Sequence, residues 1–340
     1  MTDLNKQIIN QFELLIEQIK HEIDISPNRK EALKHSFRLK QIKNALDVIK
    51  KYPHKIESGN QLTGYAGIGK GTITRIDEIL NTGHLKEINI KKKEIKNEKY
   101  MEDLEQVFGI GRKKAYELVT KYNIKSISEL KKAHIAGKIE LTDQMMVSLK
   151  HHNNYKQQIP RSEMDLVNTK IQKIASELDH KLMAKICGSY RREKPTSNDI
   201  DILITYPDII TKKQLVNNKL NYLKLFVQQL KDNGLILDDL TYENYETKYM
   251  GYFRLKSDYP TRRIDIYYIP YESYYAALLH LTGSGNFNRK MRGLAINLGY
   301  KLNEYGLYKI KNGKSIRVKV NSEKDIFDEL GMDYIEPKDR

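Results

Sequence analysis

The sequence predicts a multidomain α+β protein whose N-terminal half is helical and whose C-terminal half mixes helices with strands. Its 340 residues exceed what one ordinary domain uses, and they suffice for two or three domains with separate cores. Apolar residues recur at spacings of three and four up to about residue 155, a pattern typical of helices. In the remainder, short segments alternate apolar and polar residues, a pattern typical of strands.

The first helical domain is expected in residues 1 to about 90. One helix there should bury a stripe formed by Ile8, Phe12, Leu15 and Ile19. The segment 91–99 (KKKEIKNEK) is almost wholly charged and offers no face to bury. We therefore expect it to be an interdomain linker or an exposed helix end, with a second helical block after it.

The C-terminal half is expected to hold the sheet. Strands are predicted in KLMAKI, IDILIT and RRIDIYYI, with a helix over residues 220–230 between them and a turn and helix start at IPRSEM. A helical stretch at 272–296, interrupted by TGSGNFN, and a short strand in SIRVKV indicate a smaller last subdomain. The expected parts are residues 1–92, 93–158, 159–270 and 271–340.

The composition favours an anionic partner. Lysine and arginine number 59 against 44 aspartates and glutamates, which gives a formal net charge of +15. Nucleic acid and anionic membrane both fit this excess, but no run of about 18 apolar residues and no N-terminal signal core is present. We expect an intracellular protein without a membrane segment. Cys187 is the only cysteine, which excludes an internal disulfide framework and a cysteine-rich zinc site.

A Gly-Ile-Gly turn occurs twice, each time ahead of an amphipathic helix pattern. Backbone amides at such a turn, together with the positive end of the next helix, can bind a phosphate oxygen without reading base sequence. One copy could equally be a tight turn between helices. Two copies in a basic chain favour DNA binding. The expected contact residues are Gly67, Gly69 and Lys70 in the first copy and Gly109, Gly111 and Arg112 in the second.

Three aspartates form the candidate catalytic group. In the strand IDILIT and the residue before it, Asp199 and Asp201 share one face, about 6.6 Å apart along the strand, while the isoleucines face a core. This pair alone could be a solvated strand face. Asp265, from the strand RRIDIYYI, can join it across neighbouring strands.

Three carboxylates on one face repel one another unless a cation lies between them. They can hold two Mg²⁺ ions about 4 Å apart, one activating an attacking 3′-oxygen and the other holding nucleotide phosphates. Asp265 would be placed to accept the hydroxyl proton, itself or through water. Upstream, Gly188 and Ser189 are expected in a turn that cradles phosphates, with Arg192 as a charged clamp.

Taken together, these motifs resemble those of the family X DNA polymerases, of the beta type in particular. The likeness runs from KYPHKIESG through both GIG turns, IPRSEM, CGSYRRE, DIDILIT, RRIDIYYIP, TGSGNFNRKMR and LNEYGLY to SEKDIFDEL and EPKDR. The likeness implies an N-terminal helical lyase-like domain with one helix-hairpin-helix and helical fingers with a second helix-hairpin-helix. These would be followed by a mixed α/β nucleotidyltransferase palm and a small α+β thumb.

The resemblance also implies roles for individual residues. Asp199, Asp201 and Asp265 would be the metal ligands, for two Mg²⁺ ions that Mn²⁺ can replace, and Na⁺ or K⁺ would bind at the helix-hairpin-helix turns. Glu304 and Tyr305 would belong to the closing subdomain and Arg263 would contact DNA. The implied nucleotide contacts are Gly188, Ser189, Arg192, Ser197, Asn198, Gly283, Asn288 and Arg292.

The sequence departs from the family pattern at several positions. Arg75 stands where the lyase-active enzymes have the Schiff-base lysine, and a guanidinium stays protonated, so lyase activity is doubtful unless Lys70 or a neighbouring lysine replaces it. The Tyr-Phe pair before TGS is His280-Leu281 here. Gly285 and Asn286 follow TGS, and Asn198 replaces a glycine. We expect weaker discrimination against ribonucleotides and mispairs than in the beta enzyme.

Three functions are compatible with these sequence features. The favoured one is templated gap filling in base excision repair, by a monomer that binds gapped or nicked DNA and deoxynucleoside triphosphates. A template-independent nucleotidyltransferase would use the same carboxylates, but the sequence shows no long insertion that could block a template. A non-catalytic DNA-binding protein would not need the three aspartates. The composition is compatible with a location in the nucleus, in the bacterial cytoplasm or in a viral factory.

Overall fold

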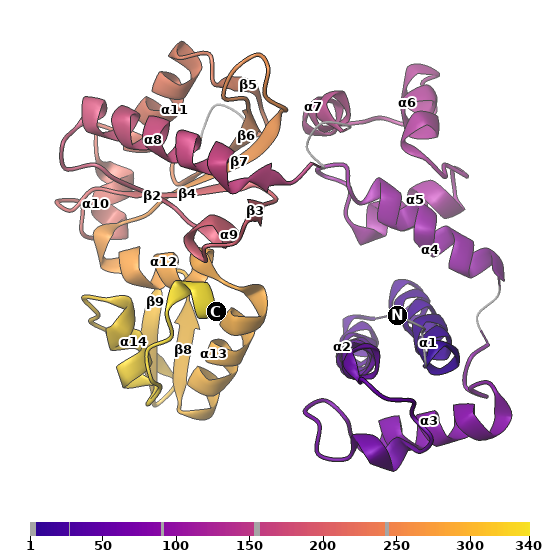
Figure 1. The fold of residues 1–340 in the computed structure, drawn as a ribbon. Helices are drawn as coiled ribbons and strands as arrows, with labels where there is room; N and C mark the ends of the chain where they lie inside the picture. The colour runs from indigo at the N-terminus through magenta and orange to yellow at the C-terminus, as the bar shows by residue number, and fades with distance from the viewer. Residues whose placement is uncertain (1–4, 27, 90–91, 153–156, 242–244) are drawn as a thin grey trace. The chain divides into compact units, whose positions relative to one another are not determined.

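The computed structural model describes residues 5–26, 28–89, 92–152, 157–241 and 245–340. These residues belong to two compact units, Met1–Met145 and Met146–Arg340 (Figure 1). In the described residues, no helix combines the length and the apolar character that crossing a membrane requires.

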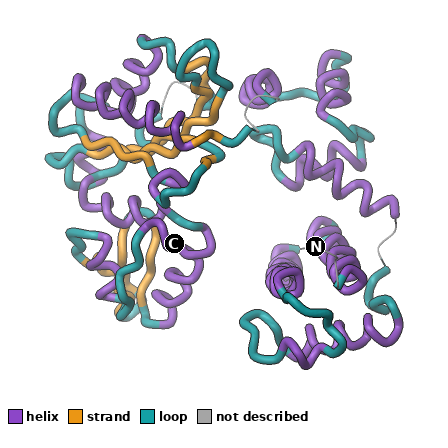
Figure 2. The backbone as a smooth tube through the Cα atoms, viewed as in Figure 1, coloured by secondary structure: helices purple, strands orange, loops and turns teal. Residues whose placement is uncertain are grey.

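The first unit is built from helices (Figure 2). Helices α1 (Lys6–Asp24) and α2 (Arg29–Lys51) pack against each other, and α3 (Lys70–Thr82) packs on α1 and on the short helix η1 (Gly59–Leu62). The predicted stripe of α1 is buried: Ile8, Phe12, Leu15 and Ile19 all lie in the core of this unit. The remaining helices are α4 (Lys92–Leu104), α5 (Arg112–Thr120), α6 (Ile127–Ile135) and α7 (Asp143–His151), the last of which continues into the second unit.

The charged segment 91–99 is not an extended linker where it is described. From Lys92 onward it is the first part of α4, and Glu98 within it is buried. The expectation that this segment has no buried face is therefore wrong. The reason is that Arg112 on α5 lies against Glu98 and gives a buried carboxylate a charged partner.

A five-stranded sheet forms the centre of the second unit. The strand order is β2 (Met183–Ile186), β4 (Ile200–Thr205), β7 (Arg262–Tyr268), β6 (Lys248–Phe253) and β5 (Ile236–Asp239), with β4 and β7 parallel and the other pairs antiparallel. The strands predicted from alternation are therefore β2, β4 and β7. Helices α8 (Arg161–Leu178) and α11 (Tyr222–Asp232) cover one face of the sheet (Figure 1). The predicted helix start at IPRSEM is α8, and the predicted helix over 220–230 is α11.

The last subdomain begins with α12 (Tyr274–Thr282), which packs against β4, and α13 (Gly285–Asn297). Of the predicted interruption TGSGNFN, only Gly283 and Ser284 lie between these two helices, and residues 285–288 form the first turn of α13. Three strands, β8 (Tyr300–Asn303), β9 (Gly306–Lys311) and β10 (Lys314–Val318), form an antiparallel sheet in the order β10-β9-β8. Helix α14 (Glu323–Glu329) closes a core that contains Phe287 and Phe327. The multidomain α+β fold class is thus confirmed.

Short elements connect these parts. Strands β1 (Ile159–Pro160) and β3 (Thr196–Ser197) pair in a separate two-stranded sheet. Helices α9 (Gly188–Arg191) and α10 (Lys212–Asn217) follow β2 and β4, and the 3₁₀ helices η2 (Tyr271–Ser273) and η3 (Pro337–Asp339) precede α12 and follow α14.

Candidate functional site

The three aspartates lie on, or directly before, two neighbouring parallel strands. Asp201 on β4 is directly opposite Asp265 on β7 in the strand register, and Asp199 immediately precedes β4. The isoleucines beside them are fully buried on the other face of the sheet. The predicted arrangement of faces follows from this register, because side chains at paired positions of adjacent strands point the same way.

The carboxylates disfavour one another's charge. Desolvation, followed by the charges of Asp199 and Asp265, raises the pKa of Asp201 to about 7. Desolvation, followed by the charge of Asp265, raises the pKa of Asp199 as well. This is the behaviour of like charges gathered in a partly dry site, and it makes the site a strong attractor of cations.

Two resident cations contact Asp265. Arg263 Nη2 lies 2.7 Å from Asp265 Oδ1, and Lys248 Nζ on the adjacent strand β6 lies 3.9 Å from Oδ2. Arg263, which we expected to contact DNA, is thus bonded to a catalytic candidate. Sequence reasoning did not find Lys248, because its approach depends on the pairing of β6 with β7 and no nearby motif marks it.

The donor set fits a hard divalent cation. Among the described residues, no group of three or more acidic, histidine or cysteine side chains is already gathered tightly enough to enclose a metal ion. Asp265 is turned toward Arg263, whereas Asp199 and Asp201 keep a repulsion that a cation would relieve. Carboxylate oxygens are the ligands that Mg²⁺ and Mn²⁺ prefer.

Gly188 lies directly beside the carboxylates. Its φ is +55°, and a Cβ atom added there would lie 2.7 Å from Asp201 Oδ2. Any other residue would therefore strain the backbone and push against the carboxylate. Gly188 and Ser189 open the short helix α9 rather than the open turn that we expected.

Arg192 follows α9 and reaches the turn between α12 and α13. Its Nη1 donates a hydrogen bond to the carbonyl oxygen of Thr282, and a Cβ atom added to Gly283 would lie 3.1 Å from the same nitrogen. The structure therefore brings together two predicted nucleotide contacts, Arg192 and Gly283, that are far apart in the sequence. The neighbouring Arg191 donates to Thr282 Oγ1 at 2.6 Å and to Glu323 Oε1 at 3.0 Å. These bonds also hold the end of α12, and the sequence did not predict them.

Asn288 and Arg292 lie on α13 and both contact His280 of α12. Asn288 Nδ2 donates to the carbonyl oxygen of His280 at 2.7 Å, and Arg292 Nη2 lies 3.0 Å from His280 Nδ1. Arg292 is also 3.7 Å from Glu304. Sequence reasoning named His280 for its effect on sugar selectivity and missed its role as the shared partner of two other site residues.

The other predicted nucleotide contacts differ in exposure. Ser197 is buried in β3, whereas Asn198 next to Asp199 is exposed. Gly285 begins α13 and has open space where a side chain would stand.

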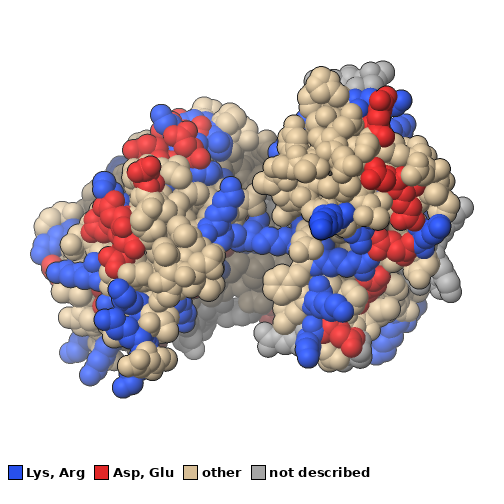
Figure 3. Space-filling model, turned by 90° about the horizontal axis from the view of Figure 1, so that it is seen from below, with Lys and Arg blue, Asp and Glu red and all other residues tan. Residues whose placement is uncertain are grey.

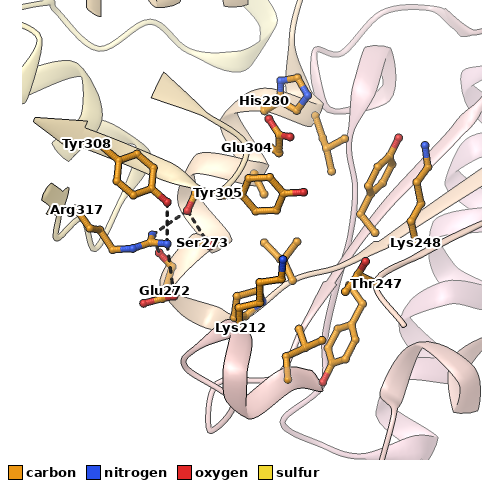
Figure 4. A pocket seen from close by; sticks show the side chains of 17 residues that line it. Lys212, Thr247, Lys248, Glu272, Ser273, His280, Glu304, Tyr305, Tyr308 and Arg317 are labelled. Atoms are coloured by element: carbon orange, nitrogen blue, oxygen red, sulfur yellow. Dashed lines mark hydrogen bonds and ion pairs between the residues drawn. The ribbon is translucent and has the colours of Figure 1, made fainter. Parts of the chain in front are cut away.

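A pocket of about 460 Å³ lies between the sheet and the last subdomain (Figure 4). Lys248 lies on its sheet side, and His280, Glu304 and Tyr305 lie on its other side. Arg317 in its wall donates to the carbonyl oxygen of Tyr305 at 2.8 Å and so fixes the loop after β8. The pocket adjoins both Lys248 at the carboxylates and His280 at the predicted nucleotide contacts.

The two Gly-Ile-Gly turns have the same backbone plan in the first unit. Gly67 and Gly109 have positive φ values of +96° and +87°, and Gly69 and Gly111 are the N-caps of α3 and α5. All four glycines are exposed. The first amides of each helix lack acceptors within the helix, so both turns present N–H groups to solvent. Lysine and arginine side chains also gather on the face of each unit that Figure 3 shows.

The side chain of Arg112, which we expected to contact DNA, has acidic partners within the first unit. Its Nε and Nη2 bond the two carboxylate oxygens of Asp24 at 2.9 and 2.8 Å, and Glu98 and Glu105 are further partners. Desolvation raises the pKa of Glu98 to about 7, although Arg112 opposes that shift. The acidic partners come from α1 and α4, so no local pattern indicated them. Lys70, by contrast, is exposed at the start of α3.

Arg75 on α3 is held by the carboxylate of Glu87. Its Nη2 lies 3.3 Å from Glu87 Oε2, its Nε bonds Glu87 Oε1, and Arg38 Nη2 bonds the same residue at 2.7 Å. Arg38 also contacts Glu22 at 2.9 Å. The position that the family resemblance connects with a lyase is thus part of an ion-pair cluster.

Comparisons with known proteins match the chain in three places. Residues 158–271 match the DNA polymerase beta palm family, residues 277–340 the DNA polymerase beta thumb family, and residues 4–85 a helix-hairpin-helix domain family. The chain is 29% identical to DNA polymerase lambda of Rattus norvegicus over 87% of the chain and 51% of that protein. It is 29% identical to DNA polymerase lambda of Arabidopsis thaliana over 99% of the chain and 62% of that protein.

A third relative is DNA nucleotidylexotransferase of Xenopus laevis, 26% identical over 87% of the chain and 62% of that protein. The chain thus spans between half and two thirds of the length of these relatives. The palm and thumb matches fall on the described sheet and on the last subdomain, and the helix-hairpin-helix match falls on the first three helices. With this order of domains and three aspartates on adjacent palm strands, the chain belongs to the family X DNA polymerases.

Proposed function

We propose that this chain is a DNA-directed DNA polymerase that adds nucleotides to a 3′-hydroxyl in short DNA gaps during base excision repair. The observation that carries the proposal is the parallel register of Asp201 with Asp265, with Asp199 one step before β4. The raised pKa values of Asp199 and Asp201, and the carboxylate oxygens of all three residues, suit a site that works with a bound divalent cation.

Asp199, Asp201 and Asp265 would hold two Mg²⁺ ions, or Mn²⁺ in their place. When bound, such ions lower the pKa of the attacking 3′-hydroxyl and neutralise the charge of the nucleotide phosphates. Asp265 accepts the hydroxyl proton directly or through water. The 3′-oxygen then bonds the α-phosphorus of the nucleotide, and the bond to pyrophosphate breaks.

The side chains around α9 and α13 would bind the nucleotide. Gly188 lies beside Asp201, so its amide and that of Ser189 would bind phosphate oxygens, and Arg192 adds a positive charge at the Gly283 turn. Asn288 and Arg292 would contact the nascent base pair, with the exposed Asn198 and the buried Ser197 near the first aspartate. These assignments rest on the family resemblance and on the contacts within the protein described above.

The partner would be gapped or nicked DNA. Exposed amides at Gly67, Gly69, Gly109 and Gly111 suit phosphate oxygens, and Lys70 adds charge at the first turn. Na⁺ or K⁺ at these turns, a monomeric state and an intracellular location belong to the same proposal. So does the division into residues 1–92, 93–158, 159–270 and 271–340, which the palm and thumb matches support at its last two parts.

The test is extension of a primer in gapped duplex DNA with Mg²⁺ or Mn²⁺. We expect templated incorporation by the wild type and none above background by Asp265→Ala. Asp208→Ala is the matched control, because Asp208 is an exposed carboxylate paired with Lys181 at 2.8 Å outside the site. Equal incorporation by wild type and Asp265→Ala would refute the proposal. DNA binding without any incorporation would leave a non-catalytic binding protein.

A second candidate is template-independent nucleotide addition. The similarity to DNA nucleotidylexotransferase of Xenopus laevis favours it. Addition to a single-stranded primer, measured beside the gapped duplex, separates the two functions. Faster addition without a template would make the transferase the better description.

A further inference from the structure

His280 lies between two predicted nucleotide contacts and connects them. Its backbone oxygen accepts a hydrogen bond from Asn288, and its ring nitrogen Nδ1 faces the guanidinium of Arg292 at 3.0 Å. Both partners lie on α13, four residues apart, whereas His280 lies near the end of α12. One residue therefore fixes the orientation of two side chains of the neighbouring helix.

The chemistry of the pair sets the protonation state of the ring. A guanidinium has only N–H donors, so Nδ1 of His280 must accept the hydrogen bond and the single ring proton must be on Nε2. A protonated imidazole would have N–H donors on both nitrogens and would face Arg292 with a like charge. The contact as observed therefore requires the neutral imidazole.

The surroundings favour this neutral form. Desolvation, followed by the charge of Arg292, lowers the pKa of His280, although Glu304 opposes the shift. Asn288, also on α13, contributes no charge. Across the pocket the titratable groups on other elements, besides Glu304, are Lys212, Lys248, Tyr267, Tyr268, Glu272, Tyr305, Tyr308 and Arg317. The ring also lines the pocket and is only half-buried, so protons can reach it (Figure 4).

We propose that His280 in its neutral form is a positioning residue for nucleotide selection, which holds Arg292 and Asn288 in place and releases Arg292 when the ring is protonated. This inference rests on the proposed polymerase function. After release, the guanidinium can bond Glu304, which is 3.7 Å from Arg292. Nucleotide affinity should then fall as the pH drops below the ordinary range of histidine.

The first experiment compares wild type with His280→Gln in single-turnover incorporation on gapped DNA between about pH 5.5 and 8, across the range in which histidine titrates. The glutamine side-chain oxygen can accept from Arg292 and does not titrate. For the wild type, we expect the apparent Kd of the correct nucleotide to rise about tenfold in acid, as expected for one lost hydrogen bond to a charged group. For His280→Gln it should stay flat, while acid lowers the incorporation rate of both proteins alike through the carboxylates.

Two further variants distinguish positioning from a general structural effect. His280→Phe removes the acceptor, so nucleotide affinity should be weakened at every pH without an acid-dependent step. His180→Gln is the matched control at a surface histidine whose side chain is 86% exposed, and it should keep the wild-type acid dependence. If His280→Gln keeps the acid rise of Kd, or His280→Phe binds nucleotide as the wild type does, the proposal is wrong.

A readout without catalysis separates this inference from the proposed function. The ring resonances of His280 in the full-length protein, assigned by their loss in His280→Gln, report which nitrogen carries the proton. We expect the Nε2–H form at neutral pH and a higher pKa in Arg292→Ala, which removes the neighbouring charge. A proton on Nδ1 at neutral pH would overturn the inference even if the enzyme polymerises. No incorporation at any pH would instead refute the polymerase proposal and leave this measurement to decide the local geometry.

Discussion

Two charged clusters, one in each unit, show opposite ways of placing charge. In the second unit, Asp199, Asp201 and Asp265 gather like charges on one sheet face, and two of them have raised pKa values. In the first unit, Glu87 is paired with both Arg75 and Arg38. Burial alone would raise the pKa of Glu87, but these two guanidiniums lower it below its ordinary value.

The difference separates a site for a ligand from a structural contact. Like charges held together on rigid strands destabilise the protein until a cation binds, so their presence indicates a function. Opposite charges that satisfy each other need no further partner. The carboxylate site therefore keeps an unmet requirement for a ligand, whereas the Arg75 cluster has its charges balanced within the protein.

The largest expected effect is on catalysis. Asp201→Asn removes one anionic oxygen donor while keeping the size of the side chain. We expect the incorporation rate on gapped DNA to fall by about 10³-fold or more, because metal-bound carboxylates stabilise charge in the transition state. Single-turnover incorporation measures this, with Asp208→Asn as the control. A loss of less than about tenfold would remove Asp201 from the metal site.

The second prediction concerns Schiff-base chemistry in the first unit. Because Arg75 is permanently protonated and ion-paired, it cannot attack an aldehyde. Borohydride trapping on an incised abasic site should therefore give little adduct, and any adduct should be lost in Lys70→Ala. A strong adduct that survives Lys70→Ala and disappears in Arg75→Ala would contradict this reading of the cluster.

The sequence predicted the strand faces because alternation is a local property. The residues of β4 and β7 carry their own pattern, and the isoleucines that it places in the core are buried. Which strand is adjacent to β4 cannot be obtained from such a pattern, since the pairing with β7 spans about 60 residues of intervening chain.

The contacts that the sequence did not reveal have the same origin. Arg112 follows a turn, where a basic residue suits phosphate, and its acidic partners Asp24 and Glu98 come from other helices. The contact of His280 with Arg292 likewise depends on how α12 and α13 cross. Contacts between elements, rather than the elements themselves, were what the sequence alone did not reveal.

The third prediction is that Asp201, a proposed metal ligand, lowers the stability of the second unit when no metal is bound. In metal-free buffer at about pH 8, Asp201→Asn should raise the free energy of unfolding of the second unit by about 1–3 kcal/mol. The folded state raises the pKa of Asp201 to about 7, so the folded protein loses stability as the pH rises from the ordinary aspartate pKa through that value. The gain should therefore disappear below about pH 4.

Urea unfolding followed by tyrosine fluorescence measures this gain, with the exposed Asp208→Asn expected to change little. Mg²⁺ should reduce the advantage of Asp201→Asn, because the wild type is stabilised by the ion that it binds. A variant less stable than the wild type at pH 8 without metal would show that Asp201 has a stabilising partner, and the contrast between the two clusters would fail.

The smallest expected effect comes from the balanced cluster. Glu87→Gln leaves Arg75 and Arg38 without their shared carboxylate, and all three side chains are between 24% and 32% exposed. Solvent screening then limits the loss in the free energy of unfolding to about 1 kcal/mol at pH 7. Because the folded pKa of Glu87 is lowered, this contribution is complete above the ordinary glutamate pKa and is lost as the pH falls through the folded value.

Urea unfolding at about pH 7 and pH 3 tests the sign of this pH dependence. Glu57→Gln is the matched control, since its pair with Lys55 is largely exposed at 3.9 Å and should contribute almost nothing. A loss for Glu87→Gln that is unchanged at pH 3 would mean that Glu87 acts through packing instead of charge.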